Sequence, residues 1–289
     1  MKITGFTIIK NAVQNDYPIV EAITSVLPMV DAMIVLVGDS TDETASLIRS
    51  IASDKIQIHH SVWDPALRSS GEILAVETNK AFDLVPADSD WAFYIQADEV
   101  IHEQYHDIIK QAAAKYKDDQ RVEGLLFNYL HFYGTYDYVG DSRKWYHKEV
   151  RLIRNDKAIR SYKDAQGFRK NGEKLKVKQV AASVYHYGWV KSPQQMLQKQ
   201  KNLTTYWSDN EKAVQEILAR EAFDFSDFDS LQKFTGTHPQ VMLPRIQSQN
   251  WQVNIDVSKK KFSVKDRLLY WFEKKTGIRL FDFRNYKEV

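Results

Sequence analysis

The stretch Trp91-Ala92-Phe93-Tyr94-Ile95-Gln96-Ala97-Asp98-Glu99 decides the fold. It opens with five apolar or aromatic residues in a row, which suits a central β-strand that is covered on both faces. Asp98 and Glu99 then follow at the carboxyl end of the strand, where open α/β sheets bind their ligands. Carboxylates in such a crevice need a positive partner, and a divalent cation bound to phosphate would meet that need. The alternative is that both are solvated loop residues before a helix.

The rest of the N-terminal part alternates between apolar, β-rich runs and segments with helical spacing. For the first helix, Asp16 is the predicted N-cap and Pro18 lies in the first turn. The repeated order of strand and helix predicts a parallel α/β sheet with right-handed crossovers. The predicted strands are 3–9, 32–37, 56–60 and 91–95, and the helices after the first are 45–51, 72–84 and 105–116.

The pattern changes after this alternating part. We expect strands at 124–132 and 149–153, joined by a long aromatic loop at 133–146, and a further strand pair within 174–187. Helices are expected at 194–207, 211–222 and 264–275. We place the end of the core near residue 205, which gives a domain at 1–205 and a mostly helical extension at 206–289.

Length and composition limit the class of protein. A chain of 289 residues with 43% hydrophobic residues is globular and near the upper limit for one compact domain. No apolar run approaches the ~20 residues of a membrane span. The absence of cysteine excludes disulfides, zinc–thiolate sites and thiol nucleophiles. Because Met1 leads directly into a strand pattern, we expect no signal peptide and a cytoplasmic location.

Positive charge is concentrated in two segments. Residues 141–180 hold 13 lysines and arginines against 5 acidic residues, and residues 259–289 hold 10 against 4. A basic segment facing an acidic sheet edge would clamp a metal diphosphate from both sides, with carboxylates on the metal and guanidiniums on the phosphates. The alternative is that these are ordinary solvated faces.

Polar residues follow each of the four predicted strands, and these strand ends converge on one crevice. A nucleotide fits there, because it needs acceptors for its base and ribose and a cation for its phosphates. The sequence contains no Walker-type phosphate loop, no dinucleotide-binding glycine motif and no nucleophile-elbow serine motif. The strand-end residues are Lys10 and Asn11, then Asp39 to Asp42, then Trp63, Asp64 and Arg68, and finally Gln96 to Glu99.

Three of these segments, 7–11, 38–44 and 94–99, resemble the successive motifs of family 2 glycosyltransferases. The later segment 185–190 is similar to a His-containing segment that closes many such cores. The resemblance covers roughly residues 1–205. It implies the GT-A (Rossmann-like) fold, with a mixed, mainly parallel sheet flanked by helices, here followed by a C-terminal helical extension. It also implies transfer of a sugar from a nucleotide-diphosphate donor to an acceptor hydroxyl, with inversion, in cell-surface polysaccharide or glycolipid synthesis.

The resemblance further implies Mg²⁺ or Mn²⁺ and a UDP-, GDP- or dTDP-sugar. The family's metal sits on a D-x-D motif, of which only Asp98 matches, because Gln96 occupies the first position and is a poorer ligand. His186 is the second candidate metal ligand, and its alternative is a structural role. Asp39 is the candidate for the base or ribose, followed by Asp42, for which a helix N-cap is the competing role.

An inverting transfer needs a general base to take the acceptor's proton. The resemblance points to Asp164, which lies after Arg151 and Arg154, and a turn aspartate is its alternative. Arg151, Arg154 and Lys191 are the candidate diphosphate partners, because the leaving group gains negative charge. The predicted donor-binding residues are thus Lys10, Asn11, Asp39, Asp42, Arg68, Gln96, Arg151 and Arg154, with Asp98 and His186 on the metal and Asp164 as the catalytic residue.

The basic, amphipathic tail at 259–289 suits docking on an anionic membrane surface, which would place the protein at the inner face of the cell membrane. Packing on its own domain or on a second subunit is the alternative. The expected acceptor is a sugar, a lipid-linked molecule or a polymer.

Three other functions are weaker alternatives to a glycosyltransferase. A nucleotidyltransferase usually needs a glycine-rich loop after the first strand, and this chain has none there. A non-catalytic sugar- or nucleotide-binding relative is suggested by Gln96. Nucleic-acid binding through residues 141–180 leaves the strand-end carboxylates unexplained, so we expect no nucleic-acid partner.

Overall fold

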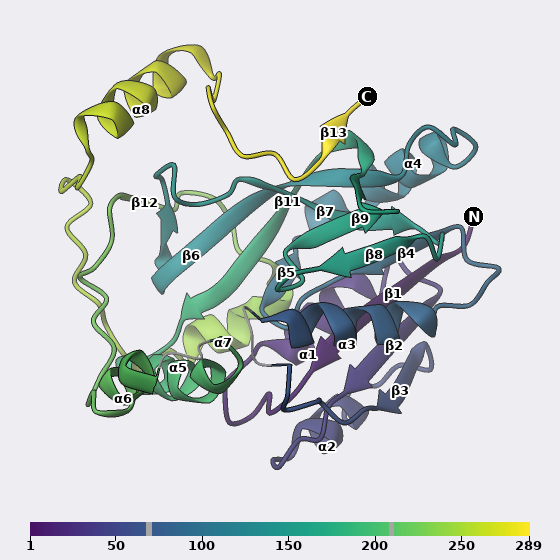
Figure 1. Ribbon diagram of the computed structural model, residues 1–289, viewed down its shortest axis with the longest axis horizontal. Coiled ribbons are helices and arrows are strands. Elements are labelled where there is room, and N and C mark those ends of the chain that lie inside the picture. The colour runs from purple at the N-terminus through teal and green to yellow at the C-terminus, as the bar shows by residue number, and fades with distance from the viewer. Residues whose placement is uncertain (68–70, 208–210) are drawn as a thin grey trace.

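The computed structural model describes residues 1–67, 71–207 and 211–289. Its N-terminal elements are β1 (Ile3–Ile9), α1 (Ile19–Val26), β2 (Ala32–Val37), α2 (Thr44–Arg49), β3 (Ile56–His60), α3 (Glu72–Asp83) and β4 (Trp91–Tyr94). The four strands run parallel, with β1 between β4 and β2, and with β3 outside β2 (Figure 1). The predicted alternation is confirmed, and β1, β2 and β3 begin and end at the predicted residues.

The middle of the chain extends the sheet with longer strands. These elements are β5 (Glu99–Ile101), η1 (Glu103–Tyr105), α4 (His106–Tyr116), β6 (Gly124–Gly140), β7 (Lys148–Arg154), β8 (Ile159–Tyr162), β9 (Gly167–Lys170), β10 (Glu173–Lys174) and β11 (Lys176–Val190). Strand β7 pairs antiparallel with both β4 and β6, whereas β6 and β11 are parallel. Strands β8, β9 and β10 form a small separate sheet. The result is a mixed α/β fold with a mainly parallel central sheet.

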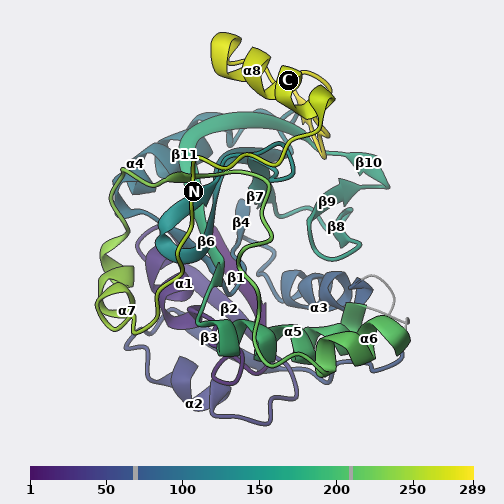
Figure 2. The same cartoon turned by 90° about the vertical axis from the view of Figure 1, so that its left-hand side faces the viewer.

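The C-terminal elements are α5 (Pro193–Trp207), α6 (Glu211–Leu218), β12 (Leu231–Lys233), η2 (Gln240–Met242), α7 (Leu243–Gln247), α8 (Val264–Thr276) and β13 (Lys287–Glu288). Helix α5 continues through residue 205, where the end of the core was expected. Strand β12 pairs with β6 and β13 with β11, so the segment after residue 205 joins the main sheet twice. Helix α8 lies at the opposite end of the molecule from α5 and α6 (Figures 1 and 2).

Three expectations about local structure need correction. Most of the predicted loop at 133–146 continues β6 to Gly140, and the strand pair expected within 174–187 is largely one strand, β11. The two strands lie side by side over 124–134 of β6, and the end of β6 at 138–140 finds its backbone partners on β12. Helix α1 begins at Ile19 with Pro18 at its N-cap, whereas Asp16 adopts a left-handed conformation with φ 49° in the preceding loop.

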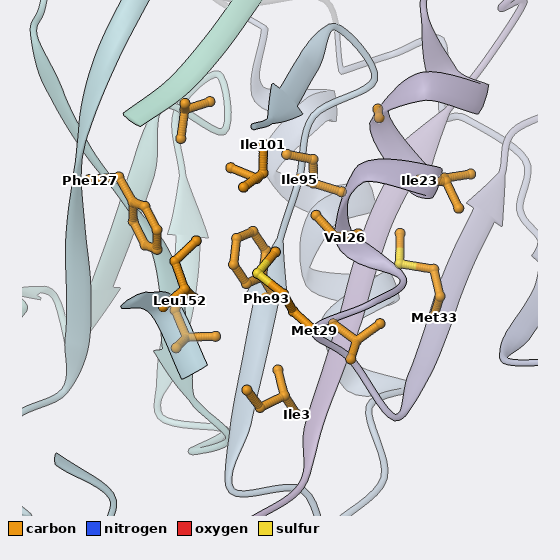
Figure 3. Close-up of a cluster of buried hydrophobic side chains, with 14 of the residues drawn as sticks. Ile3, Ile23, Val26, Met29, Met33, Phe93, Ile95, Ile101, Phe127 and Leu152 are labelled. Carbon is orange, nitrogen blue, oxygen red and sulfur yellow. The ribbon is translucent and has the colours of Figure 1, made fainter. Parts of the chain in front are cut away.

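Apolar side chains cover both faces of the sheet, as the unbroken hydrophobic run of β4 predicts. Trp91 and Phe93 pack with residues of α1 and α4 on one face, while Ala92 and Tyr94 pack with residues of α3 and the small sheet on the other. Figure 3 shows Phe93 of the first face between Leu152 of β7 and Met29 after α1. This two-sided burial fixes β4 and thereby positions the residues that follow its carboxyl end.

Candidate functional site

A cavity of about 500 Å³ lies at the carboxyl ends of β1 and β4. The carboxyl ends of parallel strands meet at one edge of a sheet, and ligands of open α/β folds bind there. Helix α3, strand β11, helix α5 and four loops complete the wall. The loops are those before α1, after β3, between β6 and β7, and between β8 and β9. The lining residues include Lys10, Asn11, Tyr17, Trp63, Gln96, Asp98, Tyr146, Asp164, His186, Lys199, Lys201 and Asn202.

Asp98 is the most strongly paired acid of this cavity. Lys199 of α5 places its Nζ 3.2 Å from Asp98 Oδ2, and His186 of β11 places its Nε2 3.7 Å from Asp98 Oδ1. Burial alone would raise the pKa of Asp98, but the charge of Lys199 and the contact with His186 outweigh it and hold the pKa far below its usual value. Asp98 is therefore a carboxylate at neutral pH, and Lys199 is an ammonium.

Gly188 allows this group to assemble, because the backbone of β11 passes directly beside it. A Cβ added at Gly188 would lie 2.5 Å from Asp98 Oδ2 and 2.6 Å from His186 Nε2, closer than side chains can approach. The carbonyl oxygen of Gly188 also accepts a hydrogen bond from Lys199 Nζ at 3.0 Å. A larger residue at this position would therefore force the Asp98 and His186 side chains to shift.

The residues around Asp98 do not fit a divalent cation. An ammonium already occupies Asp98 Oδ2, and a metal ion at the same oxygen would be repelled by it. Gln96 offers only a neutral amide, which is 3.5 Å from Tyr94 Oη and from the carbonyl oxygen of Ala165. Across residues 1–67, 71–207 and 211–289, no group of three His, Asp or Glu side chains could hold a metal ion.

Glu99 does not support Asp98 in the cavity, although it is the next residue. The chain turns between Gln96 and Glu99, where the backbone N–H of Glu99 donates to the carbonyl oxygen of Gln96 at 3.1 Å, and Glu99 is 0% exposed. Arg151, which is 1% exposed, donates to Glu99 from Nε at 2.8 Å and from Nη2 at 2.6 Å. Arg151 therefore neutralises a buried acid behind the cavity and is not among the cavity-lining residues, contrary to its expected role on the diphosphate.

Arg154 also lies away from the cavity. Strand β7 runs antiparallel to β4, so Arg154 pairs with Trp91 at the opposite end of the sheet from Asp98. Its guanidinium donates to the backbone carbonyls of Tyr116, Lys117, Asp119 and Val122, which hold the end of α4. The prediction that Arg154 binds the phosphates is therefore wrong. Its side chain instead stabilises the backbone at the end of α4. Arg68, the remaining predicted arginine, lies outside the described residues.

The segments that follow β1 and β2 form a polar corner beside the cavity, of which Lys10 and Asn11 belong to the lining. Lys10 Nζ lies 2.8 Å from Asp39 Oδ2, and the backbone N–H of Trp63 donates to Asp39 Oδ1 at 3.0 Å. Burial would raise the pKa of Asp39, but these two hydrogen bonds lower it below its usual value. Asn11, with φ 52°, turns the chain away from β1 and accepts from the backbone N–H of Thr41 at 2.8 Å. This corner presents Lys10 and Asn11 to the cavity.

Asp42 holds the same corner together from outside the cavity lining. It accepts hydrogen bonds from the backbone N–H groups of Gln14 and Thr44, at 2.8 and 3.1 Å, and from the hydroxyl of Thr44. Both carboxylate oxygens are thus used within the protein. The N-cap position of α2 itself is Glu43, one residue later than expected.

Asp164 reaches the cavity from the loop between β8 and β9. The residues on either side of it, Lys163 with φ 55° and Ala165 with φ 59°, are left-handed, a conformation that costs most residues about 1 kcal/mol or more. Strain on both sides of one carboxylate is typical of a functional loop. The structure therefore brings Lys10, Asn11, Gln96, Asp98, Asp164 and His186 to one cavity.

Helix α5 supplies cavity residues that the sequence did not indicate. Lys199, Lys201 and Asn202 line the wall from this helix, and Tyr17 lines it from the loop before α1. Lys199 Nζ lies 4.7 Å from the centre of the Tyr17 ring, a cation–π contact.

Lys191, the third predicted partner of the diphosphate, is fully buried near Tyr17. Burial lowers the pKa of Lys191 to about 7, and its Nζ donates to the carbonyl oxygen of Asp16. Lys191 is thus absent from the cavity lining.

Comparison with known proteins gives distant structural similarity only. No protein-family model matches the chain, and no curated protein matches it. S. aureus TarS is similar at 15% identity and a TM-score of 0.38, over 76% of this chain and 42% of that chain, so the chain spans less than half of that relative. TarS 1–349 in complex with UDP-GlcNAc is similar at 16% identity and a TM-score of 0.40, over 76% and 71%.

Glucosyl-3-phosphoglycerate synthase from Mycobacterium tuberculosis, in complex with Mn²⁺, UDP and phosphoglyceric acid, is similar at 20% identity and a TM-score of 0.30, over 45% of this chain and 43% of that chain. Similarity at this level does not transfer a ligand or a reaction to this chain.

Proposed function

We propose that this protein is a glycosyltransferase of family 2 with the GT-A fold, which moves a sugar from a nucleoside diphosphate to an acceptor hydroxyl. The observation that carries the proposal is the cavity at the carboxyl ends of β1 and β4. Its lining contains the polar corner with Lys10 and Asn11, the charged group around Asp98, and the carboxylate of Asp164, which has no ion pair within the described part of the chain. Its volume suits a ligand of this size.

The polar corner would hold the nucleoside. Lys10 and Asn11 present an ammonium and an amide at the cavity wall, and Trp63, whose ring centre lies 5.6 Å from Lys10 Nζ, lines the same wall. Asp39 acts on the nucleoside through Lys10, whose ammonium it holds at 2.8 Å. The diphosphate would then extend along the cavity toward Lys199 and His186.

Asp164 would act as the general base. As the acceptor oxygen attacks the anomeric carbon, its proton passes to the Asp164 carboxylate. The bond between the anomeric carbon and the phosphate oxygen breaks, and its electron pair leaves with the nucleoside diphosphate. Attack and departure on opposite faces of the sugar invert its configuration. Tyr146, beside the cavity, offers an aromatic face for the acceptor, which we place among sugars, lipid-linked molecules and surface polymers.

The proposal is tested by a thermal-shift screen of UDP, GDP and dTDP against the full chain. A ligand at 100 times its Kd stabilises the folded state by about 2.7 kcal/mol, so one of the three should raise the melting temperature clearly. The corresponding sugar nucleotides are then followed for release of the nucleoside diphosphate. If none of the three binds, the proposed function is refuted.

Asp164→Asn tests the catalytic step separately. This variant should bind the nucleotide as the wild type does and lose turnover by about 10²- to 10⁴-fold, the usual contribution of a general base. Asp107→Asn is the matched control, because that carboxylate is exposed on α4. Unchanged turnover in Asp164→Asn would remove Asp164 from the mechanism.

A further inference from the structure

Three contacts hold the ammonium of Lys199 in place, each from a different element of the fold. Asp98 Oδ2 lies 3.2 Å away after β4, the carbonyl oxygen of Gly188 lies 3.0 Å away on β11, and the Tyr17 ring centre lies 4.7 Å away before α1. An ammonium has three N–H groups. Asp98 and Gly188 accept from two of them, the Tyr17 ring contacts the ammonium through its face, and Lys199 is itself part of the cavity lining. Among residues 1–67, 71–207 and 211–289 no further acceptor hydrogen-bonds to Lys199 Nζ, so the third N–H can serve a ligand.

We propose that Lys199 provides the positive charge that binds the donor's diphosphate, in the place where a GT-A glycosyltransferase would hold a divalent cation. This inference rests on the proposed function and specifies how the same site works. Two separate features of the chain point the same way. Gln96 removes one charged metal ligand, and Lys199 occupies the carboxylate that remains.

The role of Lys199 in the reaction follows from its charge. When the bond between the anomeric carbon and the phosphate oxygen breaks, the leaving diphosphate gains one negative charge. An ammonium fixed beside it stabilises that charge without having to move. Asp98 acts through Lys199 as a positioning residue, because it orients the ammonium and keeps it protonated. His186 Nε2, 3.7 Å from Asp98, is positioned on the same carboxylate.

The test measures binding of UDP, GDP and dTDP by calorimetry, once with EDTA and once with Mn²⁺. For the nucleotide that binds, wild type should give the same affinity in both conditions within about twofold. Lys199→Met should weaken binding about tenfold or more, as loss of a charge-assisted hydrogen bond does. Lys199→Arg, which keeps the charge, should retain more affinity than Lys199→Met. Lys115→Met removes a charge from the exposed surface of α4 and should bind as wild type does.

Lys199→Met leaves Asp98 buried without its ammonium and could fail to fold. The double variant Asp98→Asn/Lys199→Met avoids this, because both members of the pair are neutral, and it should show the same loss of binding. Binding that EDTA abolishes and Mn²⁺ restores in wild type would overturn the inference and leave the proposed function standing. Wild-type affinity in the double variant would also overturn it. Failure of all three nucleotides in both conditions would refute the proposed function, and the inference with it.

A second inference comes from helix α8 and is independent of the cavity. The inner side of this helix is polar: Tyr270 Oη and Lys274 Nζ bond to Asp141 at 2.5 and 2.7 Å, and Glu273 bonds to Arg143 at 2.7 Å. The outer side is apolar, with Val264 81%, Leu268 64% and Trp271 60% exposed. The segment after the helix adds further exposed apolar side chains, namely Ile278, Phe281 and Phe283. Polar contacts thus anchor α8 and leave its apolar side uncovered.

Cations surround this apolar side. In the described part of the chain, Lys265, Arg267 and Lys275 are exposed and have no ion pair. An apolar helix face bordered by basic residues is typical of helices that lie in the interface of an anionic bilayer. A second copy of the chain fits less well, because a symmetric contact would bring these like charges together. No helix within 1–67, 71–207 or 211–289 is long and apolar enough to cross a bilayer.

We infer that α8 and residues 278–283, which we name the apolar tail surface, bind anionic phospholipid membranes. The test is co-sedimentation of the full chain with vesicles of phosphatidylglycerol and phosphatidylcholine, against vesicles of phosphatidylcholine alone. Binding should require the anionic lipid and weaken with salt. Leu268→Ser/Trp271→Ser and, separately, Lys265→Gln/Arg267→Gln/Lys275→Gln should each reduce it about tenfold or more. Ile108→Ser, on the exposed side of α4, should not.

Two results would overturn this second inference. The first is no sedimentation with anionic vesicles, or sedimentation that neither variant reduces. The second is a concentration-dependent dimer in light scattering that Leu268→Ser/Trp271→Ser dissociates, without vesicle binding, which would assign the apolar tail surface to a second copy of the chain.

Discussion

Glu149→Gln should change how the stability of this protein depends on pH. Glu149 and Glu99 are both buried beside Arg151, so one guanidinium faces two carboxyl groups. Arg151 hydrogen-bonds to Glu99, whereas Glu149 Oε2 lies 3.9 Å from Arg151 Nη1 and has no hydrogen-bond partner in the described structure. Burial, opposed by Arg151 and reinforced by the charge of Glu99, raises the pKa of Glu149 to about 8.

The sign and size of the effect follow from this shift. An ordinary glutamate has a pKa of 4.5, so between pH 4.5 and about 8 the unfolded chain releases a proton that the folded chain keeps. The free energy of unfolding therefore falls as pH rises through this window, by up to about 1.4 kcal/mol per pH unit. From pH 5 to pH 7 the loss from Glu149 is about 3 kcal/mol at most. Glutamine has no proton to release, so the variant lacks this loss.

Urea unfolding followed by tryptophan fluorescence, at several pH values from 5 to 8, measures the effect. The stability of Glu149→Gln minus that of wild type should increase steadily with pH over this range. Glu173→Gln is the control, because the Glu173 side chain is 79% exposed, and its difference from wild type should stay constant. A constant difference for Glu149→Gln as well would refute the reasoning, since it would mean that Glu149 is ionised in the folded protein.

Two further substitutions separate the residues of the cavity from those that only support the fold. Gly188→Ala places a Cβ 2.5 Å from Asp98 Oδ2 and should weaken the binding of the nucleoside diphosphate about tenfold or more, as measured by calorimetry. Unchanged affinity would contradict the geometry around Asp98. Arg154→Met removes the guanidinium that donates hydrogen bonds to four backbone carbonyl oxygens. It should lower the free energy of unfolding, measured with urea, by about 1–3 kcal/mol and leave nucleotide affinity unchanged. A selective loss of affinity in Arg154→Met would return Arg154 to the phosphate site.

The fold could be predicted from the sequence where burial is two-sided. Strand β2 is a continuous apolar run that ends before Gly38, and β1 is buried along its whole length and ends before Lys10. The prediction failed where pairing with a neighbouring strand decides how far a strand extends. Strands β6 and β11 are longer than predicted because they pair with each other over 124–134 of β6, and because the end of β6 at 138–140 pairs with β12. The course of the chain after residue 205 was also missed, since β12 and β13 are only two or three residues long and form through pairing with distant strands.

The sequence predicted the site residues that directly follow a strand. It did not predict those whose position depends on the direction of a strand or on the packing of a helix. Lys10, Asn11, Gln96 and Asp98 follow β1 and β4 directly, so their position at the sheet edge follows from the parallel order. The direction of β7 is not visible in its sequence, and that direction decides that Arg154 lies at the far end. Lys199 belongs to a helix in which polar residues predominate, and its position beside Asp98 follows only from the packing of α5 against the end of β11.

The most direct measurement is a crystal structure of the full chain grown with the nucleoside diphosphate that binds and with Mn²⁺ present. We predict that the base lies near Lys10 and Asn11, that a diphosphate oxygen lies within hydrogen-bond distance of Lys199 Nζ, and that Lys199 stays on Asp98. A manganese ion joining Asp98 to the phosphates, with Lys199 displaced, would contradict the role of the lysine. A nucleotide bound away from this cavity would contradict the account as a whole.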